Sequence, residues 1–429
     1  MNTSVDVVEQ KGASRWSLSA LARTLVLKQL RQLRTGSLTL VEGAQRWHFG
    51  EPQSAAALTG ELHIRDPHAY VDILSGGSIG AAEAYMTGDW TTPDLTALVR
   101  IMVRNMDVLD DIEGGLALLA KPLRRWFHRL NQNTPRGSKR NIAAHYDLGN
   151  DLFELFLDPS MMYSSAIFPH AKATLAEASA HKLDVICQTL GLKPGERVIE
   201  IGTGWGGFAL HAAQHYGVHV TTTTISEEQY ALAQQRVAEA GLQDRITLLK
   251  QDYRALEGQF DKLVSIEMIE AVGWQYYPTF FETCSRLLKP GGAMLMQAIT
   301  IPEQRYERAK KDVDFIQRYI FPGSCIPSVK ALNDACQQVS DMRLVQMQDF
   351  AEHYARTLRA WFDAFVGQRE RVSALGYDTT FQRMWEFYLC YCEGGFAERA
   401  IGVAHLLYAK PEFKDEPLAR NLVEQGSHE

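Results

Sequence analysis

The chain has 429 residues, of which 46% are hydrophobic and 10% aromatic, enough apolar material for about two or three domains. Its net charge of -7 argues against a nucleic-acid-binding protein. The six cysteines show no C-x-x-C pair and no metal-ligand spacing with histidine, so we expect no metal site and a reducing compartment. Because neither a signal-peptide pattern nor an apolar run of about 20 residues is present, we expect a cytoplasmic protein.

Residues 1–118 are predicted to form a small mixed α+β domain. Leucines at helical spacing, with arginine and lysine between them, predict a helix with a basic face over 15–34. Apolar runs over 38–41 and 46–49 flank a short turn and predict a β-hairpin. A strand over 60–65 and a helix over 95–108 complete this domain.

Residues 119–140 are predicted to link this domain to the rest of the chain. The segment holds seven basic residues and no acidic residue, with Trp126 and Phe127 among them. It is either a solvated basic linker or a contact for anionic lipid headgroups, with the aromatic side chains entering the interface.

Strands and helices alternate through the larger part of the chain, 141–429. Strands are predicted near 197–201, 218–224, 245–250, 260–266 and 293–299, and helices near 206–216, 227–240 and 277–288. This alternation is typical of a parallel sheet with helical crossovers. We therefore predict an α/β domain with a doubly wound, Rossmann-like sheet.

A glycine-rich turn follows the first of these strands. Gly202, Gly204 and Gly206 occupy alternate positions, and residues without a Cβ allow a backbone to turn tightly against a small molecule. Ligands of open α/β sheets bind at the carboxyl ends of strands. The spacing departs from the dinucleotide pattern G-x-G-x-x-G and suits S-adenosylmethionine (SAM) better; at this point a purely structural turn remains the alternative.

Several ordered motifs resemble those of the cyclopropane-fatty-acyl-phospholipid synthases, a group that includes the mycolic acid cyclopropane synthases. The motifs are Ala144-His-Tyr-Asp147, Leu157-Asp-Pro159, Met162-Tyr-Ser164, Ile201-Gly-Thr-Gly-Trp-Gly-Gly207, Thr224-Ile-Ser226 with Gln229, Gln251-Asp-Tyr-Arg254, Tyr319-Ile-Phe-Pro-Gly323 and Tyr388-Leu-Cys-Tyr-Cys-Glu393. The resemblance implies a class I SAM-dependent methyltransferase that modifies the double bond of unsaturated phospholipid acyl chains. It further implies a peripheral position on the inner leaflet of the membrane, and we also consider a homodimer.

The resemblance also implies which residues hold SAM. Tyr163, Ser164, Gly202 and Gly204 would line its methionine end, and the turn also includes Glu200, Thr203 and Gly206. Thr224, Ile225 and Gln229 would reach the ribose, and Asp252 and Tyr253 would hold the adenine. Helix capping is the alternative role for Thr224 and Ser226.

The resembled family is described as holding a bicarbonate ion that takes up the proton lost on ring closure. Three of the implied positions match in this chain, namely Glu270, Ile299 and Tyr354. Ser165 replaces the family cysteine and Gln297 the family histidine, while the turn carries Glu200 and Thr203 in place of aspartate and cysteine. Since serine and glutamine supply neither a titrating thiol nor an imidazole, bicarbonate binding and a cyclopropane product are both in doubt.

Glu270 could itself be the base, its pKa raised by an apolar pocket, or a structural carboxylate that caps the helix start at Trp274. Tyr354 lies in a helical stretch, where core packing is the alternative. Cys392 matches a position sometimes assigned to the active site, although a buried inert thiol is favoured.

Three functions follow. The leading one is cyclopropane fatty acid synthesis, with methyl- or methylene-branching of the acyl chain as its alternative. The second keeps the chemistry on a free fatty acid, acyl thioester or other small lipid. The third is a non-catalytic protein that binds SAM or lipid.

Overall fold

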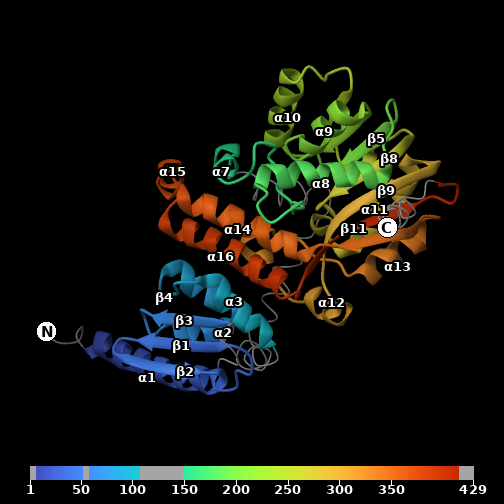
Figure 1. Cartoon of the computed structure of the whole chain (residues 1–429). Coiled ribbons are helices and arrows are strands. Elements are labelled where there is room, and N and C mark those ends of the chain that lie inside the picture. The colour runs from blue at the N-terminus through green and yellow to red at the C-terminus, as the bar shows by residue number, and fades with distance from the viewer. Residues whose placement is uncertain (1–5, 52–57, 107–147, 415–429) are drawn as a thin grey trace, which may run out of the picture. The chain divides into compact units, whose positions relative to one another are not determined.

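The computed structural model describes residues 6–51, 58–106 and 148–414, which divide into two compact units (Figure 1). The first unit takes residues 1–127, 312–320 and 369–398, and the second takes 128–311, 321–368 and 399–429. The predicted linker over 119–140 lies outside the described residues, and the predicted domain boundaries stay predictions.

The first unit holds a four-stranded sheet in the order β2-β1-β3-β4, together with helices from three parts of the chain. Its elements are α1 (Asp6–Leu30), β1 (Ser37–Glu42), β2 (Gln45–Phe49), β3 (Thr59–Ile64), α2 (Ala69–Thr87), β4 (Trp90–Thr91), α3 (Leu95–Arg104), the π-helical turn η5 (Ile316–Ile320), α15 (Arg369–Ala374) and α16 (Thr379–Ala397). The predicted hairpin is confirmed, because β1 and β2 pair antiparallel. Helix α16 was not predicted; it packs on α2 and α3, and Thr96 of α3 donates to Glu393 of α16 at 2.8 Å.

The second unit is built on a seven-stranded sheet in the order β10-β11-β9-β8-β5-β6-β7. Its strands are β5 (Arg197–Ile201), β6 (His219–Thr224), β7 (Ile246–Lys250), β8 (Phe260–Ile266), β9 (Leu288–Thr300), β10 (Arg343–Asp349) and β11 (Gly402–Ala409). The five predicted strands are confirmed and pair parallel. Strands β10 and β11 were not predicted, and β11 pairs antiparallel with both of its neighbours.

Helices cover both faces of this sheet (Figure 1). Helices α8 (Leu175–Leu190), α9 (Gly207–Tyr216) and α10 (Glu227–Glu239) pack in one core, and α11 (Tyr277–Leu287) and α13 (Val329–Val339) in the other. The unit also contains α7 (Asn150–Glu154), α12 (Glu303–Ala309) and α14 (Ala351–Gly367), with 3₁₀ turns η2 (Tyr253–Ala255), η3 (Ile269–Ala271) and η4 (Trp274–Tyr276).

Alternate residues of each strand enter different cores, because successive side chains of a strand point to opposite faces. On β5, Val198 packs in the core formed with α8, α9 and α10, whereas Ile199 packs in the core formed with α11 and α13. On β9, Leu295 packs in the core with α8, α9 and α10, and Met296 packs in the core with α11 and α13. This three-layer arrangement confirms the predicted doubly wound α/β fold.

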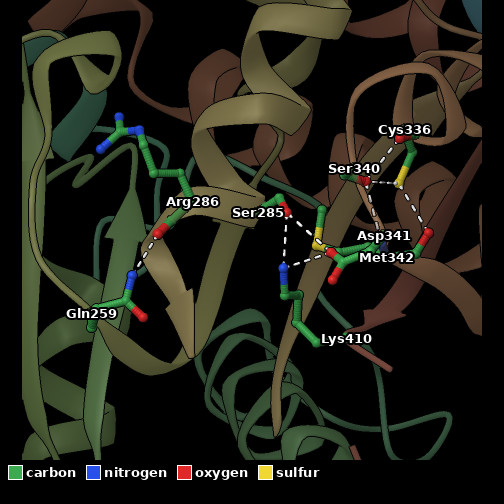
Figure 2. A network of polar contacts seen from close by, with 8 residues as sticks. All are labelled: Gln259, Ser285, Arg286, Cys336, Ser340, Asp341, Met342 and Lys410. Carbon is green, nitrogen blue, oxygen red and sulfur yellow. Dashed lines mark hydrogen bonds and ion pairs between the residues drawn. The ribbon is translucent and has the colours of Figure 1, made fainter. Parts of the chain in front are cut away.

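Polar contacts connect Lys410, which directly follows β11, to residues of the neighbouring helical layer (Figure 2). Lys410 donates to Ser285 of α11 at 3.1 Å and to Asp341 at 2.5 Å, and Ser285 donates to Asp341 at 3.3 Å. Beyond α13, the Ser340 hydroxyl donates to the Cys336 carbonyl at 2.7 Å. These contacts fix the antiparallel strand that pairs with β9, which carries part of the site described next.

Candidate active site

The glycine-rich turn lies at the carboxyl end of β5 and has the conformation that the glycines permit. Gly202, Gly204 and Gly206 have φ angles of 104°, 53° and 86°, in the region that favours glycine. A Cβ added at Gly204 would meet nothing within 4 Å, whereas one at Gly202 would lie 3.3 Å from Met268. The turn therefore borders open space at Gly204, as a cradle for a small molecule requires.

Two buried polar side chains, Glu200 and Thr222, form a hydrogen-bonded network with Thr203 of this turn. Thr222 of β6 donates to the Glu200 carboxylate at 2.6 Å, and its hydroxyl oxygen lies 2.7 Å from that of Thr203. Glu200 is 1% exposed, and burial raises its pKa to about 8. The glutamate and threonine that replace the family residues thus form one buried network.

The segment 157–166 is held beside the turn by residues from three elements. Arg236 of α10 donates to the Ser160 carbonyl at 3.0 Å and to the Trp205 carbonyl at 2.8 Å. Asp158 accepts from Ser179 of α8 at 3.0 Å, and a Cβ on Gly207 would lie 2.9 Å from the Ser160 carbonyl oxygen. This packing places Tyr163, Ser164 and Ser165 next to the turn.

Lys182 of α8 is buried beside this segment and was not predicted from the sequence. Its ammonium group donates to the Ser164 hydroxyl at 2.9 Å, and burial lowers its pKa to about 8. Its charge acts on both Glu200 and Glu267, which counteracts the effect of their burial. Lys182 lies on the buried face of α8, four residues from both Ala178 and Ile186, so its helical spacing was the available signal.

The polar residues after β6 are largely engaged with one another. Ser226 is the N-cap of α10 and accepts from the Gln229 backbone at 3.3 Å, so the capping alternative is confirmed for Ser226. The Thr224 hydroxyl donates to the Gln229 side chain at 2.9 Å and accepts from the Ser226 backbone at 3.1 Å. Ile225 lies half-buried between them.

After β7, Asp252 caps the turn η2 and holds Arg254 through two side-chain hydrogen bonds of 2.8 and 2.6 Å. The neighbouring Tyr253 hydroxyl is buried without a hydrogen-bond partner. An unpartnered buried hydroxyl at a strand end is the kind of group that a polar ligand would satisfy.

Glu267 is the centre of the second half of the site and was not predicted from the sequence. It directly follows β8, and its half-buried carboxylate accepts from the Ser165 backbone at 2.8 Å, the Gln297 side chain at 2.7 Å and the Tyr354 hydroxyl at 2.7 Å. Burial raises its pKa, and these three donors act in the opposite direction. An acidic residue at the end of a buried strand was the available signal.

Glu270 lies on η3 and is 8% exposed. One carboxylate oxygen accepts from the Ile299 backbone at 2.5 Å, and the other is buried without a partner. Burial, reinforced by the charge of Glu267, raises its pKa to about 8. The prediction of a raised pKa is confirmed, whereas the helix-capping alternative is wrong, because the turn at Trp274 has no side-chain cap.

Gln297 of β9 is fixed in one orientation by His405 of β11. The His405 ring nitrogen Nε2 lies 3.0 Å from the Gln297 amide oxygen. Because burial lowers the His405 pKa to about 3, the ring is neutral, and Nε2 donates to the amide oxygen. The Gln297 amide nitrogen is thereby directed at Glu267 and at the Ser165 carbonyl, the latter at 3.2 Å.

Aromatic rings surround Tyr163 and Tyr354. The Tyr163 ring lies 5.3 Å from that of Trp361 and 5.1 Å from that of Phe153, while the Tyr354 and Trp361 rings meet at 6.1 Å. Tyr354 is 5% exposed, so it both packs in the core and donates to Glu267. Such π faces stabilise a positive charge placed against them.

Cys392 lies on α16 in the first unit, whereas the other candidate residues lie in the second. Burial raises the pKa of its thiol, chiefly by desolvation, and nothing in its surroundings favours the thiolate. Its catalytic role stays a prediction.

The parallel pairing of β5, β6, β7, β8 and β9 brings their carboxyl ends to one edge of the sheet. A glycine turn open to a small molecule and polar groups at successive strand ends at this edge define a SAM-dependent methyltransferase. The chain belongs to the mycolic acid cyclopropane synthetase family, whose sequence model matches residues 123–406.

Known proteins support this assignment. The chain is 41% identical to tuberculostearic acid methyltransferase UfaA1 of Mycobacterium tuberculosis over 76% of its own length and 78% of that protein. It is 36% identical to the cyclopropane-fatty-acyl-phospholipid synthase of Escherichia coli over 82% and 88% of the two chains. The solved structure of the mycolic acid cyclopropane synthase CmaA1 complexed with SAH and CTAB superposes with a TM-score of 0.59 at 32% identity, covering 63% of this chain and 98% of that one.

The protein is therefore an enzyme that uses SAM to modify a lipid, and the alternative of a non-catalytic binding protein is set aside. Among residues 6–51, 58–106 and 148–414, no helix has the length and apolarity that crossing a bilayer requires.

Proposed function

We propose that this enzyme transfers the methyl group of SAM to the double bond of an unsaturated phospholipid acyl chain. The observation that carries the proposal is the pair of shielded carboxylates, Glu267 and Glu270, at the sheet edge that also bears the SAM turn. Methyl transfer to an alkene leaves a positive charge on the acyl chain and requires a base that removes a proton. A buried acidic pair beside aromatic rings suits both requirements.

We infer that SAM lies over the turn at Gly202 and Gly204, where a Cβ added at Gly204 would meet open space. Tyr163 and Ser164 would line its methionine end. The residues after β6, Thr224, Ile225 and Gln229, would meet the ribose, and the residues after β7, Asp252 and Tyr253, would meet the adenine. When bound, SAM supplies an electrophilic methyl group.

The residues of this chain would then act on the acyl chain. The rings of Tyr163, Tyr354 and Trp361 would face the positive charge that forms when the alkene takes the methyl group. They would also exclude water, which otherwise could add to the cation. The acidic pair would take the proton that leaves.

The product depends on which bond forms as the proton leaves. Loss of a proton from the new methyl group with ring closure gives a cyclopropane, the product named for the Escherichia coli relative. A methylene- or methyl-branched chain is the second candidate. It is favoured by the replacement of the family cysteine and histidine by Ser165 and Gln297, and by the 41% identity to a tuberculostearic acid methyltransferase.

Lipid analysis of a host without cyclopropane lipids tests this function. Cells that express the full chain should contain phospholipid acyl chains that have gained one carbon atom. Ring and methylene products have the same mass, so NMR must distinguish the cyclopropane protons from the vinylic ones. Free fatty acids and acyl thioesters extracted from the same cells test the alternative substrates. Unmodified lipids in cells that hold folded, SAM-binding protein would contradict the proposal.

We also propose that the first unit docks on an anionic membrane surface. Three of the six exposed large hydrophobic side chains among the described residues lie on α1, namely Leu18, Leu21 and Leu25, which are 56%, 60% and 37% exposed. Their spacing places them on one face of the helix, and exposed Lys28 and Arg31 follow. An apolar face with basic neighbours is typical of a helix that lies in an anionic interface.

Sedimentation with phosphatidylglycerol vesicles tests this docking. Replacing Leu18, Leu21 and Leu25 by glutamine should weaken binding strongly. The same change at Leu375, which is 42% exposed in the same unit, is the matched control and should have little effect. Equal sedimentation of the triple variant and the control would show that α1 does not contact the membrane. The basic segment 119–140, the peripheral location and the homodimer stay predictions.

A further inference from the structure

The hydrogen-bond donors that the family resemblance assigns to bicarbonate already have acceptors within this chain. The Ser165 backbone, the Gln297 amide and the Tyr354 hydroxyl all donate to Glu267, at 2.7–2.8 Å. The remaining donor, the Ile299 backbone, is held by Glu270. A bicarbonate ion would need these same donors and would lie against the negative charge of the Glu267 carboxylate, which repels it. The site does not fit bicarbonate.

The backbone at Glu267 is strained in a way that only its side chain explains. Its φ of 48° lies in the left-handed region, which among the described residues only Met161 and Arg399 share outside glycine. This conformation brings the Cβ close to the following carbonyl oxygen and is strained for any residue other than glycine. Glycine would adopt this conformation without strain, so Glu267 places a carboxylate at a position where the backbone conformation favours glycine. Strain of this kind concentrates at functional sites.

The two carboxylates of the site differ in their hydrogen bonding, which decides where the charge lies. Glu267 has three donors, whereas one oxygen of Glu270 is buried with none. Donors stabilise the ionised form, and an unpartnered buried oxygen favours the protonated form. The three donors thus favour the negative charge of the pair on Glu267, while burial raises the pKa of Glu270 to about 8 and favours the proton there.

We propose that the Glu267 carboxylate takes the place of the family's bicarbonate and is the proton acceptor of the reaction, which rests on the proposed function. After the methyl group has joined one carbon of the double bond, the cation lies on the other carbon, and a C–H bond of the new methyl group breaks. Its electron pair bonds to the cationic carbon and closes the ring. If a hydride first shifts between the two carbons, the cation lies on the carbon that bears the methyl group, and the same electron pair forms the double bond of a methylene branch. The proton passes to a Glu267 oxygen, and the neutral carboxyl group later releases it to water. Atoms and charge balance without a bound anion.

Bicarbonate dependence of the purified full chain on vesicles of unsaturated phospholipid tests this proposal. Wild-type activity should be the same in CO₂-depleted buffer with and without added bicarbonate. Glu267→Gly relieves the backbone and leaves three donors facing a vacated space. Its activity in CO₂-depleted buffer should fall by roughly 10²-fold or more, the usual scale for a positioned base, and added bicarbonate should restore part of it. Glu267→Gln should lose as much activity without rescue, because the amide fills the space.

Direct binding gives a second readout. Labelled bicarbonate should bind to Glu267→Gly, detected by NMR or in crystals, and should bind neither to the wild type nor to Glu267→Gln. Glu282→Gln, at an exposed glutamate of α11, is the matched control and should leave activity unchanged. Melting temperature and SAM affinity check that each variant is folded.

The outcomes separate the two proposals. A wild-type enzyme that requires bicarbonate, or a Glu267→Gly variant fully active without it, would overturn the role of Glu267 while leaving lipid methylation intact. A wild-type enzyme that modifies no lipid in either buffer would instead overturn the proposed function. The wild-type assay decides even if Glu267→Gly does not fold.

Discussion

Glu270→Gln should change how the stability of the second unit depends on pH. The pKa of Glu270 in the folded chain is raised from 4.5 to about 8, so the folded state binds this proton more tightly than the unfolded state. The stability that Glu270 contributes is therefore fully present below pH 4.5 and is lost as the pH rises through about 8. The glutamine side chain is neutral at every pH, so the Glu270→Gln variant loses no stability at this position as the pH rises.

The size of the effect follows from the two pKa values. Their difference, at about 1.36 kcal/mol for each pH unit, sets an upper limit of about 5 kcal/mol. Glutamine keeps an acceptor for the Ile299 backbone but buries an amide where Glu270 has an unpartnered oxygen, at a cost of about 1–3 kcal/mol. Glu270→Gln should thus be slightly less stable than the wild type at pH 5 and about 1–3 kcal/mol more stable at pH 8.

Urea unfolding between pH 5 and pH 8.5, monitored by hydrogen exchange of the β8 and β9 amides, measures the stability difference between variant and wild type within the second unit. Glu282→Gln at an exposed position should show no such pH dependence. A stability difference between Glu270→Gln and the wild type that stays constant over this range would show that Glu270 does not hold a raised pKa.

Further substitutions test other contacts of the site. Tyr354→Phe removes one of the three donors to Glu267, so the Glu267 pKa should rise; the acid limb of the pH–rate profile should move to higher pH, and an unshifted limb would contradict the contact. Gly204→Ala should weaken SAM binding, measured by calorimetry, far more than Gly191→Ala. Both glycines have positive φ and free space around an added Cβ, but only Gly204 lies in the turn. Equal SAM affinities of the two variants would show that the turn does not bind SAM. Arg236→Met should destabilise the protein by about 1.5–3 kcal/mol and weaken SAM binding, because the Trp205 carbonyl of the turn and the Pro159 and Ser160 carbonyls beside it lose their donor. Unchanged melting temperature and SAM affinity would show that Arg236 does not position the turn.

The sequence predicted the parallel part of the sheet because the evidence for it is local. Strand-like runs that alternate with segments of helical periodicity identify β5 to β9, and the alternate glycines after β5 indicate the SAM turn. The antiparallel strands β10 and β11 have no such local signal, because β11 pairs with β9, more than 100 residues earlier, and β10 pairs with β11, more than 50 residues later. The inclusion of α16 in the first unit is equally non-local.

The site residues also divide into those that the sequence indicated and those that only the fold revealed. The resemblance to the family was sufficient to name Glu270, Tyr354 and Gln297 as candidates. The sequence did not reveal Glu267, because its importance comes from a left-handed backbone and from three donors on separate segments of the chain. The sequence by itself determined which chemical groups are available. Only the tertiary structure decided which carboxylate is ionised, because a pKa depends on the burial and hydrogen bonds that folding creates around each oxygen.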